Sequence, residues 1–137
     1  MKVRLEEGAK APNRAYPTDA GLDLFAYDEG YVNAHSYRTF RTGVHVELPE
    51  NTCGLLVSKS GLYSKHGITS TGLIDESYSG EIMVTLHNCS FREYKVEKGD
   101  KISQLVVIPC RYEGVEIVDY LEEKGRGNNG FGSTGKQ

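Results

Sequence analysis

The sequence lacks the features that would place the protein in a membrane or on a nucleic-acid polymer. No apolar run in its 137 residues approaches the roughly 20 residues that cross a bilayer. The opening segment, MKVRLEEGAK, has no apolar stretch of the kind found in a secretory signal. Its 16 basic residues stand against 19 acidic ones, for a net charge of −3, whereas a polymer-binding protein is expected to be basic. We therefore expect a cytoplasmic protein with no membrane and no nucleic-acid polymer as its partner.

Cysteine is also scarce. Cys53, Cys89 and Cys110 are far apart, odd in number and without a CxxC spacing, which argues against a disulfide framework or a zinc site. Each falls in or beside an apolar stretch. They are expected to be small core residues in a reducing cytosol.

The remaining composition is that of one ordinary globular domain, with 38% apolar and 26% charged residues. Apolar residues alternate instead of recurring every three or four positions, which indicates strands. The segments with this pattern, or with a short apolar run, are GVHVEL (43–48), CGLLV (53–57), EIMVTLHN (81–88), QLVVI (104–108) and GVEIVDY (114–120). Turn-forming residues separate them. The sequence therefore predicts an all-β barrel or sandwich.

Two segments depart from the strand pattern. SGLYSKHG (60–67) predicts one short helix, with Ser60 as its N-cap and Gly67 at its end. After Tyr120 the periodicity stops, and Phe131 is the only apolar side chain of residues 122–137. We expect a β domain over residues 1–121 and a flexible C-terminal arm over 122–137 that orders only against something else.

The segment GLIDESYSGE (72–81) carries the first candidate for chemistry. Asp75 follows an apolar pair and precedes a turn, and a carboxylate that loses solvation at the end of a buried strand is suited to act as a base. Alternatively, Asp75 caps the turn, as aspartate often does.

Anion and metal sites are suggested elsewhere in the body. The N–H groups that follow Ser60, beside Lys59, form a candidate anion site, although an ordinary capped helix explains the same residues. EKGDKISQL (97–105) adds Asp100, Lys101 and Gln104 as candidates, although EKGD is otherwise typical of a solvated turn. Asp23, between Leu22 and Leu24, is a candidate for holding Mg²⁺ through water or, alternatively, a solvent-facing strand residue.

Within the arm, residues 126–137 combine four glycines with one aromatic and several phosphate-binding groups. Glycine allows the turns with positive φ that direct successive N–H groups at an anion. Arg126 can hold a phosphate through two hydrogen bonds, Ser133 and Thr134 add hydroxyls, and Phe131 can stack on a base. A plain disordered end is the alternative. Together with the candidate base and metal carboxylate, these groups indicate a nucleotide site.

These segments resemble the trimeric deoxyuridine triphosphatases. The family's five motifs occur in order, as AGLDLFA (20–26), SKSGLYSKHGI (58–68), GLIDESYSGE (72–81), KGDKISQLV (98–106) and RGNNGFGSTG (126–135). The resemblance implies a single-domain jelly roll that assembles as a homotrimer with shared active sites. It further implies Mg²⁺-dependent hydrolysis of dUTP to dUMP and pyrophosphate, which limits uracil in DNA and supplies dUMP for dTMP synthesis.

The resemblance also assigns roles. Asp75 would be the base that activates water, Asp23 would hold Mg²⁺ through its waters, and Tyr78 would exclude a 2′-hydroxyl. The backbone around Thr71–Leu73 would read uracil, in a hairpin too tight for the methyl group of thymine. The implied substrate-binding residues are Lys59, Ser60, Gly61, Thr71, Gly72, Leu73, Tyr78, Gln104, Arg126, Phe131, Gly132, Ser133 and Thr134. From the arm, Phe131 would stack on uracil while the other groups clamp the phosphates, so that the arm closes as a lid on a neighbouring subunit.

Two positions depart from the family pattern. Lys59 stands where the family usually has arginine, and Thr69 where it often has asparagine.

Two other functions compete with hydrolysis. A dCTP deaminase shares the jelly roll but lacks the terminal lid with its phenylalanine. A nucleotide-gated regulator, in which the trimer binds a protein partner, is the second alternative and applies if the chain is phage-encoded. The short loops between the motifs favour a plain hydrolase.

Overall fold

The computed structural model describes all 137 residues and contains ten strands and one helix. In chain order the elements are β1 (Lys2–Leu5), β2 (Leu22–Phe25), β3 (Gly30–Val32), β4 (Tyr37–Arg41), β5 (Val44–Glu47), β6 (Thr52–Val57), α1 (Ser60–His66), β7 (Ile68–Ile74), β8 (Met83–Asn88), β9 (Tyr94–Val96) and β10 (Lys101–Pro109). The single helix is seven residues long, and no helix is long and apolar enough to span a membrane.

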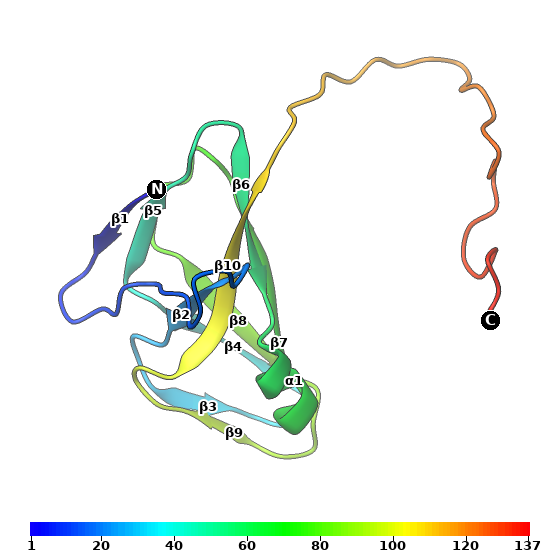
Figure 1. Ribbon diagram of the computed structural model, residues 1–137. Coiled ribbons are helices and arrows are strands. Elements are labelled where there is room, and N and C mark those ends of the chain that lie inside the picture. Colours follow the sequence, from blue (N-terminus) through cyan, green and yellow to red (C-terminus); the bar gives the residue numbers. More distant parts are fainter.

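The strands form one large curled sheet and two small ones (Figure 1). The large sheet has six strands in the order β2-β10-β6-β7-β8-β4, and β1-β5 and β3-β9 form two-stranded sheets beside it. Every strand pair is antiparallel. This is the predicted all-β jelly roll with one short helix.

The core lies on the concave side of the large sheet and is built by alternation. Val44, Val46 and Leu48 are buried, as are Ile82, Val84 and Leu86, so the period-two pattern located both strands and their inward faces. Strands β6 and β10 also coincide with the two apolar runs. Sixteen buried apolar residues form one continuous cluster, and no buried side-chain polar atom lacks a hydrogen-bond partner.

The helix starts differently from the prediction. Lys59, not Ser60, occupies the N-cap position, with an extended backbone (φ −78°, ψ 126°) and no side-chain cap. Ser60 is already the first helical residue, so its predicted capping role is wrong. The predicted end is confirmed: Gly67 is left-handed (φ 66°), and its N–H bonds back to the carbonyls of Leu62 and Tyr63.

Two further expectations fail. The cysteines are free but not in the core, because Cys53 and Cys110 are only half-buried and Cys89 is exposed. No strand forms over residues 114–120, where Val115 and Ile117 are 88% and 90% exposed. The alternating pattern is present there, but the isolated chain offers no neighbouring strand to pair with it.

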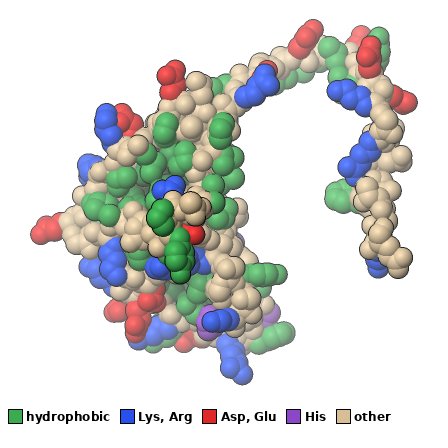
Figure 2. Space-filling model, viewed as in Figure 1, with side chains coloured by type: hydrophobic (Ala, Val, Ile, Leu, Met, Phe, Trp, Pro, Cys, Tyr) green, Lys and Arg blue, Asp and Glu red, His purple; other side chains and the backbone are tan.

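In the structure the extended C-terminal segment, called the arm from here on, starts at Cys110 after the end of β10 and arcs away from the body (Figure 1). Residues 122–137 form its outer part. No hydrogen bond or ion pair joins residues 113–137 to residues 1–109. On the visible face of the body, acidic and basic side chains are intermixed (Figure 2). The arm is therefore a separate, extended segment with its apolar side chains in solvent.

Replacing Gly67 with alanine should destabilise the fold. Alanine at position 67 would have to keep the left-handed backbone of Gly67 (φ 66°), and its Cβ would lie 3.3 Å from the Cβ of Ser90. We therefore expect the free energy of unfolding to fall by about 1–2 kcal/mol. Urea unfolding at fixed protein concentration measures this. The matched control is Gly61→Ala in the same helix, where a Cβ meets nothing within 4 Å, and where alanine is neutral or slightly stabilising. Equal effects of the two variants would contradict the prediction.

Candidate active site

Four strands bring predicted site residues into one row across the large sheet. Gln104 on β10 pairs with Asp23 on β2 and with Val57 on β6, and Val57 pairs in turn with Thr71 on β7. Strand β6 ends at Val57, and α1 starts three residues later at Ser60, so the pairing of Val57 also positions Lys59 and the start of α1. Segments separated by as many as 81 positions, from 23 to 104, thus meet at one end of the sheet.

Asp23 is the electrostatic centre of this row. Only 5% of the residue is exposed, so the alternative of a solvent-facing strand residue is wrong. The ammonium of Lys59 pairs with its Oδ1, and that of Lys101 pairs with its Oδ2 at 2.8 Å. Burial opposes ionisation, but the hydrogen bonds and charges of Lys101 and Lys59 outweigh it and hold the pKa of Asp23 below its usual value. The carboxylate is therefore charged at neutral pH.

The predicted phosphate-binding residues lie next to Asp23. Gln104 is half-buried, and its side-chain amide donates to the carbonyl of Ser58 at 3.2 Å. A Cβ at Gly21 would lie 2.7 Å from Gln104 Oε1, so glycine is needed there to leave room for this side chain. Ser60 and Gly61 are exposed in the first turn of α1, free to contact a ligand.

Beneath the row lies a buried serine network that the sequence did not reveal. The hydroxyls of Ser70 and Ser103 are 2.8 Å apart, and Ser103 also donates to the carbonyl of Val57 at 3.0 Å. Ser58 accepts from the N–H of Ser70 at 2.9 Å. These bonds tie β6, β7 and β10 together under the site. Serines in short polar segments resemble turn residues, which is why their structural role was missed.

Residues Thr71–Leu73 form an open strand edge. They pair with β6, whereas the ladder between β7 and β8 covers only Ile68–Ser70. Alternate residues of a strand direct their N–H and C=O groups to opposite sides, so part of this stretch presents unpaired backbone groups. These backbone groups lie on the β7 strand of the β7-β8 hairpin and are open to a ligand.

Asp75 follows the end of β7 and is exposed in the isolated chain. Its backbone carbonyl accepts from the N–H of Tyr78 at 3.0 Å, but its carboxylate makes no hydrogen bond within the chain. The alternative that its side chain caps the turn is therefore not what the structure shows. Asp75 lines two adjoining hollows, of about 240 Å³ and 220 Å³.

Tyr78 borders the larger of these hollows together with Leu73, Ile74 and Met83. Its hydroxyl donates to the carbonyl of Glu81 at 2.8 Å, and its ring lies against Gly80, where any Cβ would collide with it. Glu81 in turn accepts from Arg41 Nε at 3.1 Å and from the N–H of Gly43 at 2.8 Å. Glu81, which sequence reasoning missed, anchors the loop that carries Asp75 and Tyr78.

The start of the arm is fixed beside Asp75. The hydroxyl of Tyr112 donates to Glu76 Oε1 at 3.0 Å, and Glu76 also accepts from the N–H of Asn51. Burial and the hydrogen bond to Glu76 raise the pKa of Tyr112 to about 12, so the phenol stays protonated as a donor. No signal in the sequence distinguished Tyr112 from other surface tyrosines.

The predicted site residues of the arm are all exposed, and two of them are already in contact in the isolated chain. Arg126 donates from Nε to the carbonyl of Asn129 at 2.8 Å and from a terminal nitrogen to Ser133 Oγ at 3.0 Å. Gly127, Gly132 and Gly135 have positive φ, as the glycine pattern predicted. Phe131 and Thr134 are exposed nearby. Two of the predicted phosphate groups, Arg126 and Ser133, are thus already together.

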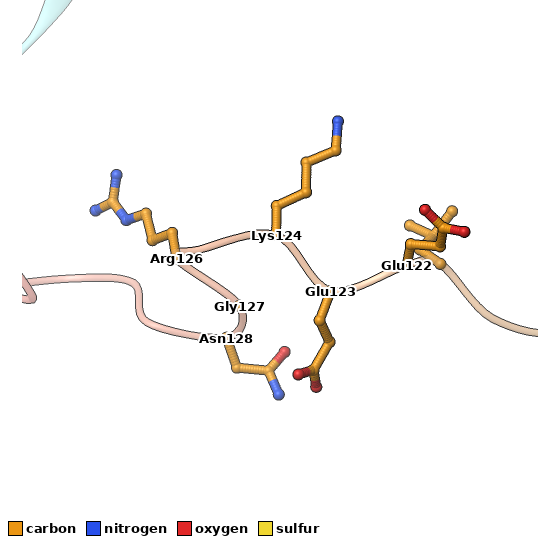
Figure 3. A pocket seen from close by; sticks show the side chains of 7 residues that line it. Glu122, Glu123, Lys124, Arg126, Gly127 and Asn128 are labelled. Carbon is orange, nitrogen blue, oxygen red and sulfur yellow. The ribbon is translucent and has the colours of Figure 1, made fainter.

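A hollow of about 530 Å³ lies within the arm, which arcs away from the strands of the body (Figure 1). Figure 3 shows Lys124 and Arg126 on one side of this bend and Glu123 and Asn128 on the other. Only arm residues line it, and it is wide open. It is a bend in an extended segment and not a binding site.

The structure therefore brings together three groups of predicted residues but does not bring the groups to one another. The row around Asp23 lies four residues along β7 from Asp75, roughly 13 Å at the usual strand rise. The predicted site residues of the arm, from Arg126 to Thr134, make no hydrogen bond or ion pair with either group. Within one chain the candidate site is incomplete.

Asp23 fits one way of holding Mg²⁺. No cluster of three or more metal-ligating side chains exists in the structure, so an all-protein cage is excluded. Mg²⁺ commonly keeps several waters and binds through one or two carboxylates plus substrate phosphates. A single buried carboxylate beside phosphate-binding groups suits that mode.

Comparison with known proteins agrees with this geometry. The dUTPase family model matches residues 7–135. The deoxyuridine 5′-triphosphate nucleotidohydrolase of Clostridium tetani is 42% identical, with 99% of this chain and 97% of that protein covered. The enzyme of the same name from Kluyveromyces lactis is 37% identical, with 99% and 94% covered.

Two solved structures are similar over most of the chain. The dUTPase of Staphylococcus bacteriophage 80alpha with dUpNHpp has a TM-score of 0.91 at 30% identity, with 98% of this chain and 97% of that chain covered. A mutant dUTPase from phage phi11 of S. aureus, which coordinates a structural Mg(II) ion, has a TM-score of 0.82 at 29% identity, with 89% and 98% covered. On sequence, fold and the order of its site residues, this chain belongs to the dUTPase family.

Proposed function

We propose that this chain hydrolyses dUTP to dUMP and pyrophosphate at sites shared between three copies, with Mg²⁺ as cofactor. The observation that carries the proposal is the arrangement of three complementary groups of residues. One chain holds an anion-binding row around Asp23, an open strand edge beside Asp75, and a preformed arm loop with Arg126 and Ser133. Each matches one part of a nucleoside triphosphate.

Assembly explains why the groups are apart. In a homotrimer, the Asp75 loop of one copy can face the Asp23 row of a second, and residues 122–137 of a third can close over both. Beyond Tyr112 the arm makes no hydrogen bond or ion pair with its own body, and its exposed Val115 and Ile117 lack a strand to pair with. A neighbouring copy supplies what the isolated chain lacks. In this proposal residues 1–121 are the β domain and 122–137 the lid.

Base and sugar are read by β7 and the loop that follows it. Unpaired backbone groups of Thr71–Leu73 would bond the edge of uracil, as backbone groups bond in a sheet. Tyr78, held by Glu81 and Gly80, would pack against deoxyribose and leave no space for a 2′-hydroxyl. Gly72 brings this backbone close to β6, because a Cβ there would lie 2.9 Å from Leu56 Cδ1.

Asp75 would be the general base. Its carboxylate has no internal hydrogen bond, so it is free to take the proton of a water that attacks the α-phosphorus. The bond from the α-phosphorus to the oxygen bridging to the β-phosphorus breaks, and pyrophosphate leaves. Ser60, Gly61 and Gln104 would hold the phosphates in line for attack, since positioning and charge stabilisation lower most of such a barrier.

Bound Mg²⁺ would neutralise charge on the phosphates and fix their geometry. Asp23 would hold it through its waters. On the arm, Phe131 would stack on uracil, while Arg126, Gly132, Ser133 and Thr134 would clamp the terminal phosphates and exclude bulk water. Ordering the arm costs conformational entropy, which the stacking and phosphate contacts offset.

Turnover of dUTP, dCTP, dTTP and UTP, run in parallel with Mg²⁺ and separated by ion exchange, tests the proposal. We expect dUTP alone to give dUMP and pyrophosphate. Conversion of dTTP or UTP would contradict the assigned base and sugar reading, and ammonia released from dCTP would indicate a deaminase. A folded trimer that binds dUTP but turns over none of the four would instead favour the nucleotide-gated regulator.

Asp75→Asn should bind nucleotide and lose turnover. Because the amide keeps the shape but cannot accept the proton, we expect a rate about 10²–10⁴-fold lower, with the affinity for a non-hydrolysable analogue unchanged. Steady-state kinetics and calorimetry measure both. Glu50→Gln, an equal charge change at an exposed carboxylate, is the control and should keep full activity. Persistent turnover in Asp75→Asn would show that the base lies elsewhere.

Deleting residues 126–137 should leave a folded assembly that is nearly inactive. The body keeps all its contacts without the arm, so thermal unfolding should be unchanged while kcat falls sharply. Deletion of Lys136 and Gln137 alone, which spares the last motif, is the control. Full activity in the longer deletion would rule out a lid.

A further inference from the structure

Lys101 reaches the outer face of the sheet because of a β-bulge. The ladder between β10 and β2 runs regularly from Leu105 to Ser103 and then shifts, so that Lys101 pairs with Phe25. Ile102 and Ser103 are consequently both buried, although neighbouring strand residues normally point to opposite faces. In an uninterrupted strand Lys101 would share the core face of Ser103. The bulge instead turns it towards Asp23, and bulges are known to redirect side chains beside active sites.

Two positive charges surround the single negative charge of Asp23. Asp23 is one carboxylate, yet each of its oxygens carries an ammonium, from Lys59 and from Lys101. One cation suffices to neutralise it, so the cluster has an excess positive charge. The Lys101 side chain is the more accessible of the two, at 45% exposed against 24% for Lys59.

We propose that Lys101 is a phosphate-binding residue of this site, held on Asp23 in the free protein and transferred to the terminal phosphates of a bound nucleoside triphosphate. This inference rests on the proposed function. Lys101 competes with the waters of a magnesium ion for Oδ2 of Asp23, because it already holds one of that oxygen's two acceptor sites. When the triphosphate and its cation arrive, Lys101 exchanges a carboxylate oxygen for a phosphate oxygen, and Asp23 becomes free to hold the cation's waters.

The exchange keeps each charge paired throughout. Lys101 lies on a flexible four-carbon stem and donates from a compact ammonium, which can move between neighbouring oxygens without a fixed fork geometry. Lys59 is more enclosed and remains the permanent partner of Asp23. The two lysines thus have different roles, although both contact the same carboxylate.

Calorimetry with Lys101→Met tests the proposal, using dUMP, dUDP and the non-hydrolysable α,β-imido analogue of dUTP, each with Mg²⁺. A lost charge-assisted contact to phosphate should weaken binding of the triphosphate analogue about 10- to 100-fold. Binding of dUMP, which lacks the terminal phosphates, should be unchanged. Lys101→Arg should bind the analogue within a few-fold of wild type, because it restores the charge.

Lys95→Met is the matched control, since Lys95 also pairs with a carboxylate, Glu97, but on β9 away from the row. A purely structural Lys101 would lower the unfolding temperature and weaken all three ligands equally, and that result overturns the proposal. If Lys101→Met binds the triphosphate analogue as tightly as wild type, the proposal is also overturned, whereas the proposed function stands.

If wild type itself binds no analogue, the proposed function and this inference both fall. Lys101→Gln repeats the test with a polar side chain if the methionine variant unfolds.

Discussion

The pairing of β10 with β2 on one side and β6 on the other determines where every charged group of the candidate site lies. It sets Gln104 between Asp23 and Val57, and so places the end of β6, Lys59 and the first turn of α1 beside a buried carboxylate. A shift of one residue would turn Gln104 and Asp23 into the core. The serine network under the row and the glycine at position 21 act against such a shift.

The isolated chain is complete as a fold but incomplete as a site. Its core buries one continuous apolar cluster and leaves no buried polar side-chain atom unpaired, so the body needs nothing further. The arm differs from the body, because its apolar side chains face solvent and, beyond Tyr112, its few hydrogen bonds join only nearby residues. Tyr112 and Glu76 fix where it departs, next to Asp75, and leave the rest free. The body is thus stabilised by its own contacts, whereas the arm is held only at its start.

The positions of several strands and the end of the helix were predictable from the sequence. Alternation located β5 and β8 because one face of each strand is buried, and glycine at position 67 located the end of the helix because only a left-handed residue fits there. The same alternation gave a strand over residues 114–120 that does not form. Apolar periodicity shows that a segment can pair but not whether a partner strand is present in the same chain. The sequence located the motifs but not the contacts of their residues. The Tyr112–Glu76 bond and the anchoring of Tyr78 by Glu81 depend on residues that look ordinary in sequence.

The replacement of arginine by lysine at position 59 has a physical consequence that only the structure reveals. An arginine there could engage both oxygens of Asp23 through its planar fork, which would leave fewer acceptor sites on Oδ2 for a second cation. Lysine is a point donor and takes Oδ1 alone, so Oδ2 is available to Lys101. Two lysines therefore hold the charge of Asp23 where one arginine could. Because each makes a single contact, Lys101 can leave while Lys59 still pairs the buried carboxylate. In the proposed exchange, the waters of an incoming cation take the place of Lys101 on Asp23, and the single contact of Lys101 allows its release without disturbing the rest of the row.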